Sequence, residues 1–134
     1  MANEATVRTS LQIRKTSGQT TLLEYASQPS GFLATVTGTK GPTPGAMLAS
    51  TTGTDVSLTQ LTTPGLCRIM NQDVTNFVEV GIFDGVITFY PLMKLLAGES
   101  YVFRLSADVE AGAATLRIRA NTAAVNVLVE CFEV

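Results

Sequence analysis

The chain has 134 residues, of which 15% are charged and 46% are hydrophobic, and its formal net charge is −2. This length suits one domain with a sizeable core, and the weakly acidic balance argues against nucleic acid as a direct partner. Histidine is absent and the carboxylates are scattered, and no P-loop, dinucleotide-binding or nucleophile-elbow motif occurs. We therefore expect no enzyme activity, no catalytic residue, no cofactor and no metal site.

The first ten residues, MANEATVRTS, carry no readable targeting signal, because they lack the basic and apolar regions of a signal peptide. Nowhere does an apolar run reach the length of a membrane span. We expect a protein that assembles in a cytoplasm without a membrane partner. Residues 1–4 are expected to form a flexible arm.

Three strands are predicted in the first part of the chain. Residues 6–15, TVRTSLQIRK, alternate between apolar or β-branched side chains and polar ones, which is typical of a half-buried strand. Residues 21–26, TLLEYA, and residues 32–39, FLATVTGT, follow after turns rich in Ser, Gly and Pro. We expect these strands to belong to the same sandwich as the later ones.

Residues 38–54, GTKGPTPGAMLASTTGT, form the least regular stretch, with four glycines and two prolines around a short apolar segment. They predict a long loop that holds at most one short strand. Loops of this length are often interaction elements, which makes Pro42, Pro44 and Met47 candidate contact residues. Simple connection between strands is the alternative.

The rest of the chain predicts short strands with turn signals every 8–12 residues and no convincing amphipathic helix. Asp84-Gly85 is a hairpin signal between two apolar runs, and Pro91 is expected to end the second run. We predict an all-β fold: a single antiparallel β-sandwich over residues 1–134, jelly-roll-like, with short edge strands and the long Gly/Pro loop.

The last predicted strand is apolar on both faces. One face carries Val125, Val127, Val129 and Cys131, and the other carries Leu128 and Phe132 where a solvated face would be polar. Such a strand is either central in its sheet under a second layer or covered by a neighbouring subunit. The alternative is an ordinary strand with two scattered outer apolar residues. Leu128 and Phe132 are therefore candidate interface residues.

Arg117 and Arg119 alternate with two apolar residues and should face away from the core. Arginine suits bidentate pairing with carboxylates across an interface, so both are candidate interface residues. The alternative is pairing within the chain, with cross-strand partners such as Glu79 and Glu130.

The two cysteines, Cys67 and Cys131, are far apart in the sequence. In a reducing compartment we expect two buried free thiols that act as small hydrophobes. The alternative is an oxidised pair that forms later, in a released particle.

Three segments of residues 60–134 carry a family resemblance. They are NQDVTNFVEVG (residues 71–81), LAGE followed by Arg104 and Leu105 (from residue 96), and ANTAAVNVLV (residues 120–129). In this order they resemble turn and strand motifs of small structural proteins of tailed bacteriophages. No site residue carries over, because these positions look architectural. Residues before 60 share no such likeness.

The resemblance implies a virion component with a β-sandwich fold, most simply a capsid decoration or cement protein. Such a protein assembles in the host cytoplasm and binds the major capsid protein in many copies, commonly as a homotrimer or homodimer. A neck or tail protein is the alternative, as is a receptor-binding module of a tail fibre. A non-viral interaction domain also remains open.

Overall fold

The computed structural model describes residues 4–110 and 112–134. The chain divides into two compact units, Met1–Val36 and Thr37–Val134. Both are built from antiparallel strands, and among the described residues one short helix occurs, α1 (Ala107–Glu110). The predicted all-β class is therefore confirmed. We expected one sandwich over residues 1–134, but its two four-stranded sheets draw their strands from the second unit alone.

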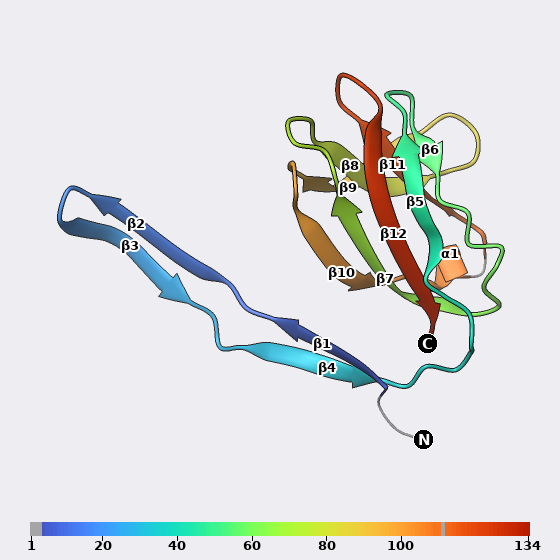
Figure 1. Ribbon diagram of the computed structural model, residues 1–134, viewed down its shortest axis with the longest axis horizontal. Helices are drawn as coiled ribbons and strands as arrows, with labels where there is room; N and C mark the ends of the chain where they lie inside the picture. The colour runs from blue at the N-terminus through green and yellow to red at the C-terminus, as the bar shows by residue number, and fades with distance from the viewer. Residues whose placement is uncertain (1–3, 111) are drawn as a thin grey trace. The chain divides into compact units, whose positions relative to one another are not determined.

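The first unit is a hairpin made of two ladders in succession (Figure 1). β1 (Ala5–Thr9) pairs with β4 (Ser30–Ala34), and β2 (Gln12–Ser17) pairs with β3 (Thr20–Ala26). The half-buried strand predicted over residues 6–15 is thus wrong. The chain breaks between β1 and β2 at Leu11, which exchanges two 2.8 Å hydrogen bonds with Ser27. Every residue of β2 and β3 is exposed rather than half-buried.

The predicted flexible arm, residues 1–4, falls mostly outside the described residues. Glu4 is described, and its carboxylate accepts a 3.2 Å hydrogen bond from the amide of Val36. Glu4 is therefore held to the end of the hairpin unit.

Two four-stranded antiparallel sheets make up the second unit. The first, called here the β12 sheet, has the order β10–β7–β12–β5, with bounds Ser100–Arg104, Pro64–Asn71, Val125–Glu133 and Thr43–Ala49. The second, called here the β11 sheet, has the order β6–β11–β8–β9, with bounds Thr54–Asp55, Thr115–Ala120, Val78–Phe83 and Phe89–Leu95.

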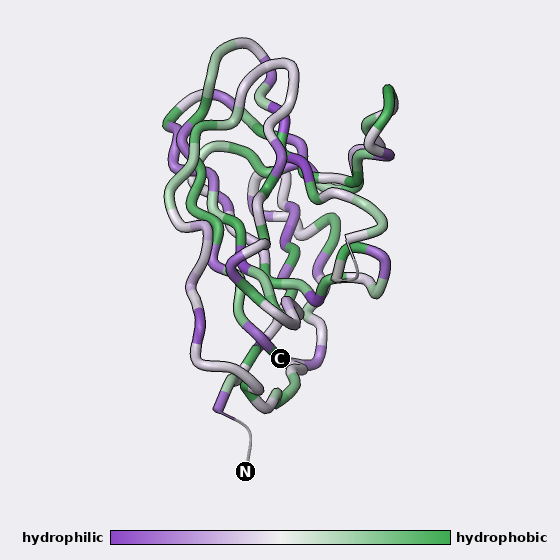
Figure 2. Tube along the Cα trace, turned by 90° about the vertical axis from the view of Figure 1, so that its right-hand side faces the viewer, coloured by the Kyte–Doolittle hydropathy of each residue, from purple (hydrophilic) through white to green (hydrophobic). Residues whose placement is uncertain are grey.

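Alternation along the strands creates the core between these sheets. In β12 every second residue from Val125 is buried, and the residues between them are exposed or half-buried. The Cα tube correspondingly changes between hydrophobic and hydrophilic along much of its length (Figure 2). A single hydrophobic cluster contains Ile69 and Val127 from the β12 sheet and Val80 and Ile118 from the β11 sheet. The two sheets therefore pack as a sandwich.

The eight strands of the sandwich pair like one long hairpin wrapped around the core. The first pairs with the last, the second with the seventh, the third with the sixth and the fourth with the fifth; in labels these pairs are β5–β12, β6–β11, β7–β10 and β8–β9. Two further pairings, β12–β7 and β11–β8, complete the sheets. The last strand is central in its sheet, as the sequence allowed.

Two sequence expectations fail at edge strands, which tolerate proline because one side of the ladder is unpaired. Residues 43–49 were expected in a long loop with at most one short strand, yet they form the seven-residue strand β5, with Met47 opposite Val127. Pro91 was expected to end a strand, yet β9 continues through it to Leu95, and the ladder absorbs it with a register shift opposite Val80 and Gly81.

Asn71 is a buried polar residue that fixes the turn after β7. Its Nδ2 donates hydrogen bonds to the carbonyls of Asn76 at 2.8 Å and Leu95 at 3.2 Å. Its Oδ1 accepts the amide of Asp73 at 2.9 Å. The turn that follows β7 is therefore anchored from inside the core.

Candidate functional site

The residues that the structure describes do not gather the groups of a metal centre. Among residues 4–110 and 112–134, no three side chains of the types His, Cys, Asp and Glu share one place. Across the same residues, no helix is long and apolar enough to cross a membrane. The features that stand out are surfaces.

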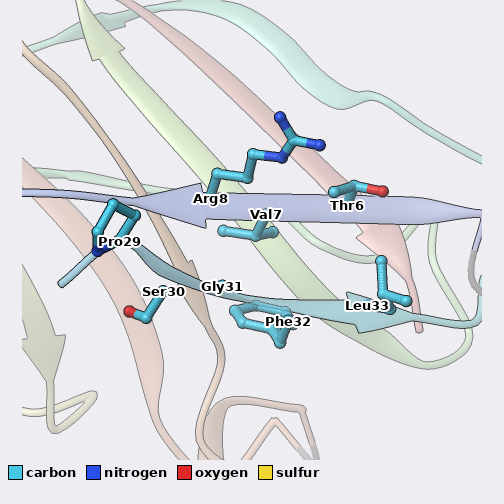
Figure 3. A pocket seen from close by; sticks show the side chains of 8 residues that line it. All are labelled: Thr6, Val7, Arg8, Pro29, Ser30, Gly31, Phe32 and Leu33. Atoms are coloured by element: carbon cyan, nitrogen blue, oxygen red, sulfur yellow. The ribbon is translucent and has the colours of Figure 1, made fainter.

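A groove of about 490 Å³ lies on the β1–β4 ladder of the hairpin unit, lined by residues 6–8 and 29–33. Figure 3 shows these side chains spread along both strands, with the guanidinium of Arg8 pointing away from β4. Small-molecule sites hold a few polar groups that converge on one point. This groove is instead open and mixed in character, which suits contact with another protein.

The β2–β3 ladder carries the most exposed apolar side chains of the hairpin unit. Ile13 lies opposite Tyr25 and Lys15 lies opposite Leu23, and Leu11 follows the same alternation. Leu11, Ile13, Leu23 and Tyr25 are all exposed, and we call them the hairpin apolar face. The opposite face carries the cross-strand pairs Gln12–Ala26 and Arg14–Glu24. Leu22 is also exposed and lies at the register shift between the two strands.

A two-stranded hairpin has no core of its own and is marginally stable in water. Covering the exposed part of each of the four side chains would contribute on the order of 1 kcal/mol apiece. The sum, about 4 kcal/mol, only reaches the low end of the roughly 4–15 kcal/mol that association costs in lost freedom. The hairpin apolar face alone therefore supports weak contacts, which become strong when many copies bind together.

The two units differ in formal charge. Residues 1–36 hold three basic and two acidic residues, while residues 37–134 hold six and nine, so the net charges are +1 and −3. Opposite signs favour contact between the hairpin of one copy and the sandwich of another, although screening keeps this contribution small.

Leu128 and Phe132 lie on the outer face of the β12 sheet, and both are half-buried. Leu128 sits between Ala46 of β5 and Met70 of β7. Phe132 covers Gly41, because a Cβ there would meet the Phe132 ring. Leu128 is therefore the better candidate for an outside contact, while Phe132 also has a packing role within the sheet.

The same outer face carries one ion pair at its centre. The Arg68 guanidinium donates to the Glu130 carboxylate, one strand across. Around it lie small and apolar side chains, including exposed Leu48 and Val102. This face is a weakly charged surface of mixed character.

Arg117 and Arg119 lie on the outer face of the β11 sheet, and each is held within the chain. Arg117 Nε donates to Asp55 at 2.5 Å, and its guanidinium lies 3.3 Å from the Phe83 ring centroid. Arg119 donates two hydrogen bonds to Glu79 and lies 4.8 Å from the Phe89 ring centroid.

A third cation lies on a ring close by, because Lys94 Nζ is 3.9 Å from the Phe77 ring centroid. The alternative of pairing within the chain holds for Arg119 with Glu79 and for Arg117 with Asp55. Glu130 pairs with Arg68 instead. Any interface role of Arg117 and Arg119 therefore uses guanidinium groups that are already oriented.

The three candidate contact residues of the predicted loop do not lie together on one surface. Pro42 precedes β5 and is exposed, Pro44 is exposed within β5, and Met47 is half-buried against the core. Pro44 lies opposite Glu130. Pro42 and Pro44 therefore remain candidates at the edge of the β12 sheet, whereas Met47 faces inward.

The β8–β9 turn, which sequence reasoning identified only as a hairpin, presents two apolar side chains. Val86 and Ile87 are 77% and 84% exposed. Asp84 Oδ1 accepts the amides of Val86, Ile87 and Thr88 at 2.9–3.0 Å. These backbone hydrogen bonds, with those from Val86 and Thr88 foremost, lower the pKa of Asp84. The turn is thus ordered around a charged carboxylate.

Cys67 and Cys131 are both buried and free, as expected. They also lie directly opposite one another on β7 and β12. Their mutual hydrogen bond and their burial raise the pKa of the Cys67 thiol. In the closed sandwich Cys67 is therefore a protonated, unreactive thiol.

The comparisons with known proteins found no match. No protein-family model, no curated protein and no solved structure matches this chain.

Sequence reasoning found the alternation that places Leu128, Arg117 and Arg119 on outer faces. It missed the hairpin apolar face, because Leu11 and Ile13 alternate as core residues would. The available signal was the partner strand: Leu23 and Tyr25 share this period, and the turn between the two strands makes them neighbours.

Proposed function

We propose that this protein is a structural component of a tailed-bacteriophage virion, a capsid decoration protein that binds the major capsid shell in many copies. The observation that carries the proposal is the hairpin apolar face: Leu11, Ile13, Leu23 and Tyr25 are exposed on a ladder that has no core of its own. A chain that works by lying against other proteins needs such surfaces and needs no reactive pocket.

The strand pairing supports a finer fold proposal. Eight strands in two four-stranded sheets, paired first with last and so on inward, correspond to a jelly roll. This architecture is used by viral capsid domains, and also by lectins and cupins. It raises the plausibility of a virion role by analogy only, because one fold serves many functions.

Two contacts carry the proposed mechanism. The hairpin apolar face of one copy, with the basic side chain of Lys15 opposite Leu23, binds the acidic sandwich of a neighbouring copy. The outer face of the β12 sheet, with Leu128 beside Met70, binds the major capsid protein. Each contact is weak, and repetition over a closed shell multiplies the resistance of the particle to internal pressure.

A ring protein of the neck or tail is the second candidate. Contact between a hairpin on one copy and a sandwich on the next is head-to-tail, and such contacts close into rings when the rotation permits. The copy number of the chain in purified particles separates the two. Hundreds of copies support decoration of the shell, whereas about six or twelve indicate a ring.

A charge substitution on the hairpin tests the proposed contact between copies. Ile13→Asp with Tyr25→Asp puts two carboxylates on the hairpin apolar face and should abolish co-sedimentation with empty capsids without unfolding the sandwich. The matched control is Gln12→Asp with Ala26→Asp, a cross-strand pair on the opposite face, which should bind like the wild type. Equal binding by both double variants would reject the hairpin contact.

The contact with the shell has its own pair of variants. Leu128→Asp should weaken binding to empty capsids at least tenfold, while Asn126→Asp, on the same face of the same strand, should leave it within about twofold. If Leu128→Asp binds normally, or if the chain binds only fractions that contain portals or tails, the decoration proposal fails.

A further inference from the structure

Cys67 and Cys131 occupy one row across the inner side of the β12 sheet. They lie opposite each other in the β7–β12 ladder, flanked by Phe103 of β10 and Thr43 of β5. Both thiols are fully buried and both are free. No step of the proposed function uses them.

Backbone hydrogen bonds identify the kind of pair that they form. Opposite residues of an antiparallel ladder alternate between pairs that exchange backbone hydrogen bonds and pairs that do not. The amide of Gln72 donates to the carbonyl of Asn126 at 3.0 Å, across the same two chain segments. From there the register runs without a shift to Cys67–Cys131, an odd number of steps away. The cysteines are therefore a non-hydrogen-bonded pair.

The other side of β7 agrees with this assignment. The amide of Asn71 donates to the carbonyl of Glu99, and the carbonyl of Asn71 accepts the amide of Gly98. The carbonyl of Gly65 accepts the amide of Leu105 in the same way. Odd-numbered residues of β7 therefore direct their backbone groups toward β10, and Cys67 is one of them.

In a non-hydrogen-bonded pair the Cα atoms approach to about 4.5 Å and the side chains lie closest. Disulfides span Cα separations of roughly 4.4–6.8 Å. We propose that Cys67 and Cys131 are the site of an intrachain cross-strand disulfide, which forms when the chain meets an oxidising small-molecule disulfide. The bridge would tie β7 to β12 at the centre of the β12 sheet.

With glutathione disulfide as the oxidant, the reaction balances in two exchanges. One cysteine loses its proton and attacks the glutathione disulfide, which gives a mixed disulfide and releases one glutathione thiolate that takes up a proton. The second cysteine loses its proton, attacks the protein sulfur of the mixed disulfide and releases the second glutathione. Two protein thiols are oxidised and one glutathione disulfide is reduced to two glutathione molecules.

Because both thiols are buried, the disulfide can form only when the sheet opens locally. A protonated thiol inside the core does not attack, so exchange needs a local opening of the sheet. In a reducing cytoplasm the pair stays reduced, and in an oxidising medium it can close. The bridge spans the chain from residue 67 to residue 131, a long loop, and cross-links over long loops remove the most entropy from the unfolded chain. This inference stands independently of the proposed function.

The test compares the full-length wild-type chain refolded from urea in oxidised or in reduced glutathione. We expect peptide mass mapping without reductant to find Cys67 joined to Cys131 in the oxidised sample, with a mass loss of two hydrogens. The bridged chain should melt roughly 10 °C higher than the reduced chain, and a reductant should reverse both changes. Cys131→Ala, which cannot bridge, should melt alike in both buffers.

Three results would each overturn the inference: two titratable thiols after refolding with oxidant, glutathione adducts or interchain dimers in place of the intrachain bridge, or a bridged chain that melts at or below the temperature of the reduced one. Because the wild-type chain supplies both arms, the test holds even if the alanine variant fails to fold.

Discussion

The hairpin unit and the sandwich unit are built from the same kind of strand, yet they treat apolar side chains in opposite ways. In β12 the alternate residues Val125, Val127 and Val129 are fully buried under the second sheet. In β2 and β3 the same alternation leaves Ile13 and Tyr25 exposed. A period of two therefore specifies which residues share a face, but only a second layer decides whether that face is covered.

This difference locates the stability of the fold in the second unit. The sandwich has its own core and needs no partner to bury it. The hairpin has an apolar face whose cover must come from outside its own ladder. Substitutions on the hairpin apolar face should therefore alter assembly, and substitutions in the core of the sandwich should alter folding.

The largest expected effect compares two isoleucines, one from each unit. Ile69→Ala, at a fully buried position of β7, should lower the free energy of unfolding by about 3 kcal/mol, because it removes buried methyl groups and leaves a cavity. Ile13→Ala, at an exposed position of β2, should lower it by less than about 0.5 kcal/mol. Urea unfolding in dilute solution measures both. A loss at Ile13 as large as that at Ile69 would mean that the hairpin apolar face is already covered in the free chain.

A smaller effect is expected on the outer face of the β11 sheet. Arg117 lies over the Phe83 ring, so Phe83→Leu and Arg117→Met should show a coupling of about 0.5–1 kcal/mol in a double-mutant cycle. Arg119 lies over Phe89 instead, so Phe83→Leu with Arg119→Met is the matched control and should show a coupling near zero. Equal coupling in the two cycles would contradict this specific pairing.

The smallest effect concerns pH and the β8–β9 turn. Backbone hydrogen bonds hold the pKa of Asp84 below its ordinary value of 3.8. Its support for the turn is therefore complete above that value and is lost as pH falls through the lower pKa of the folded chain. At neutral pH, Asp84→Ala should speed hydrogen exchange at the amides of Val86, Ile87 and Thr88. Wild type and variant should converge in strong acid, and a constant difference at every pH would rule this out.

The sequence predicts a strand and its inward face well where a local alternation of apolar and polar residues is clear, and poorly where the structure depends on a distant partner strand. The strands around Ile118 and Val127 were predicted with the correct inward faces, because every second residue of each is apolar over a buried side. The strand at Met47 was predicted only as a short strand that a long loop could hold, because glycine and proline mask its alternation and its partner β12 lies far along the chain.

The opposition of Cys67 and Cys131 could not be predicted for the same reason. It depends on the register between two strands that are distant in the sequence, and no local pattern fixes that register. The same limit applies to the candidate interface residues. Alternation placed Leu128 and Arg117 on outer faces, but the Phe83 ring and the Asp55 carboxylate that hold Arg117 come from other strands.

Hydrogen–deuterium exchange of the full chain, free in dilute solution and within purified virions, tests the central claim most directly. If the protein works by lying against other subunits, the amides of β2 and β3 should exchange rapidly in the free chain and become strongly protected in the particle. The buried strands β7 and β12 should be protected in both states. Rapid exchange of β2 and β3 in both states, or a chain that is absent from the particle, would contradict the account.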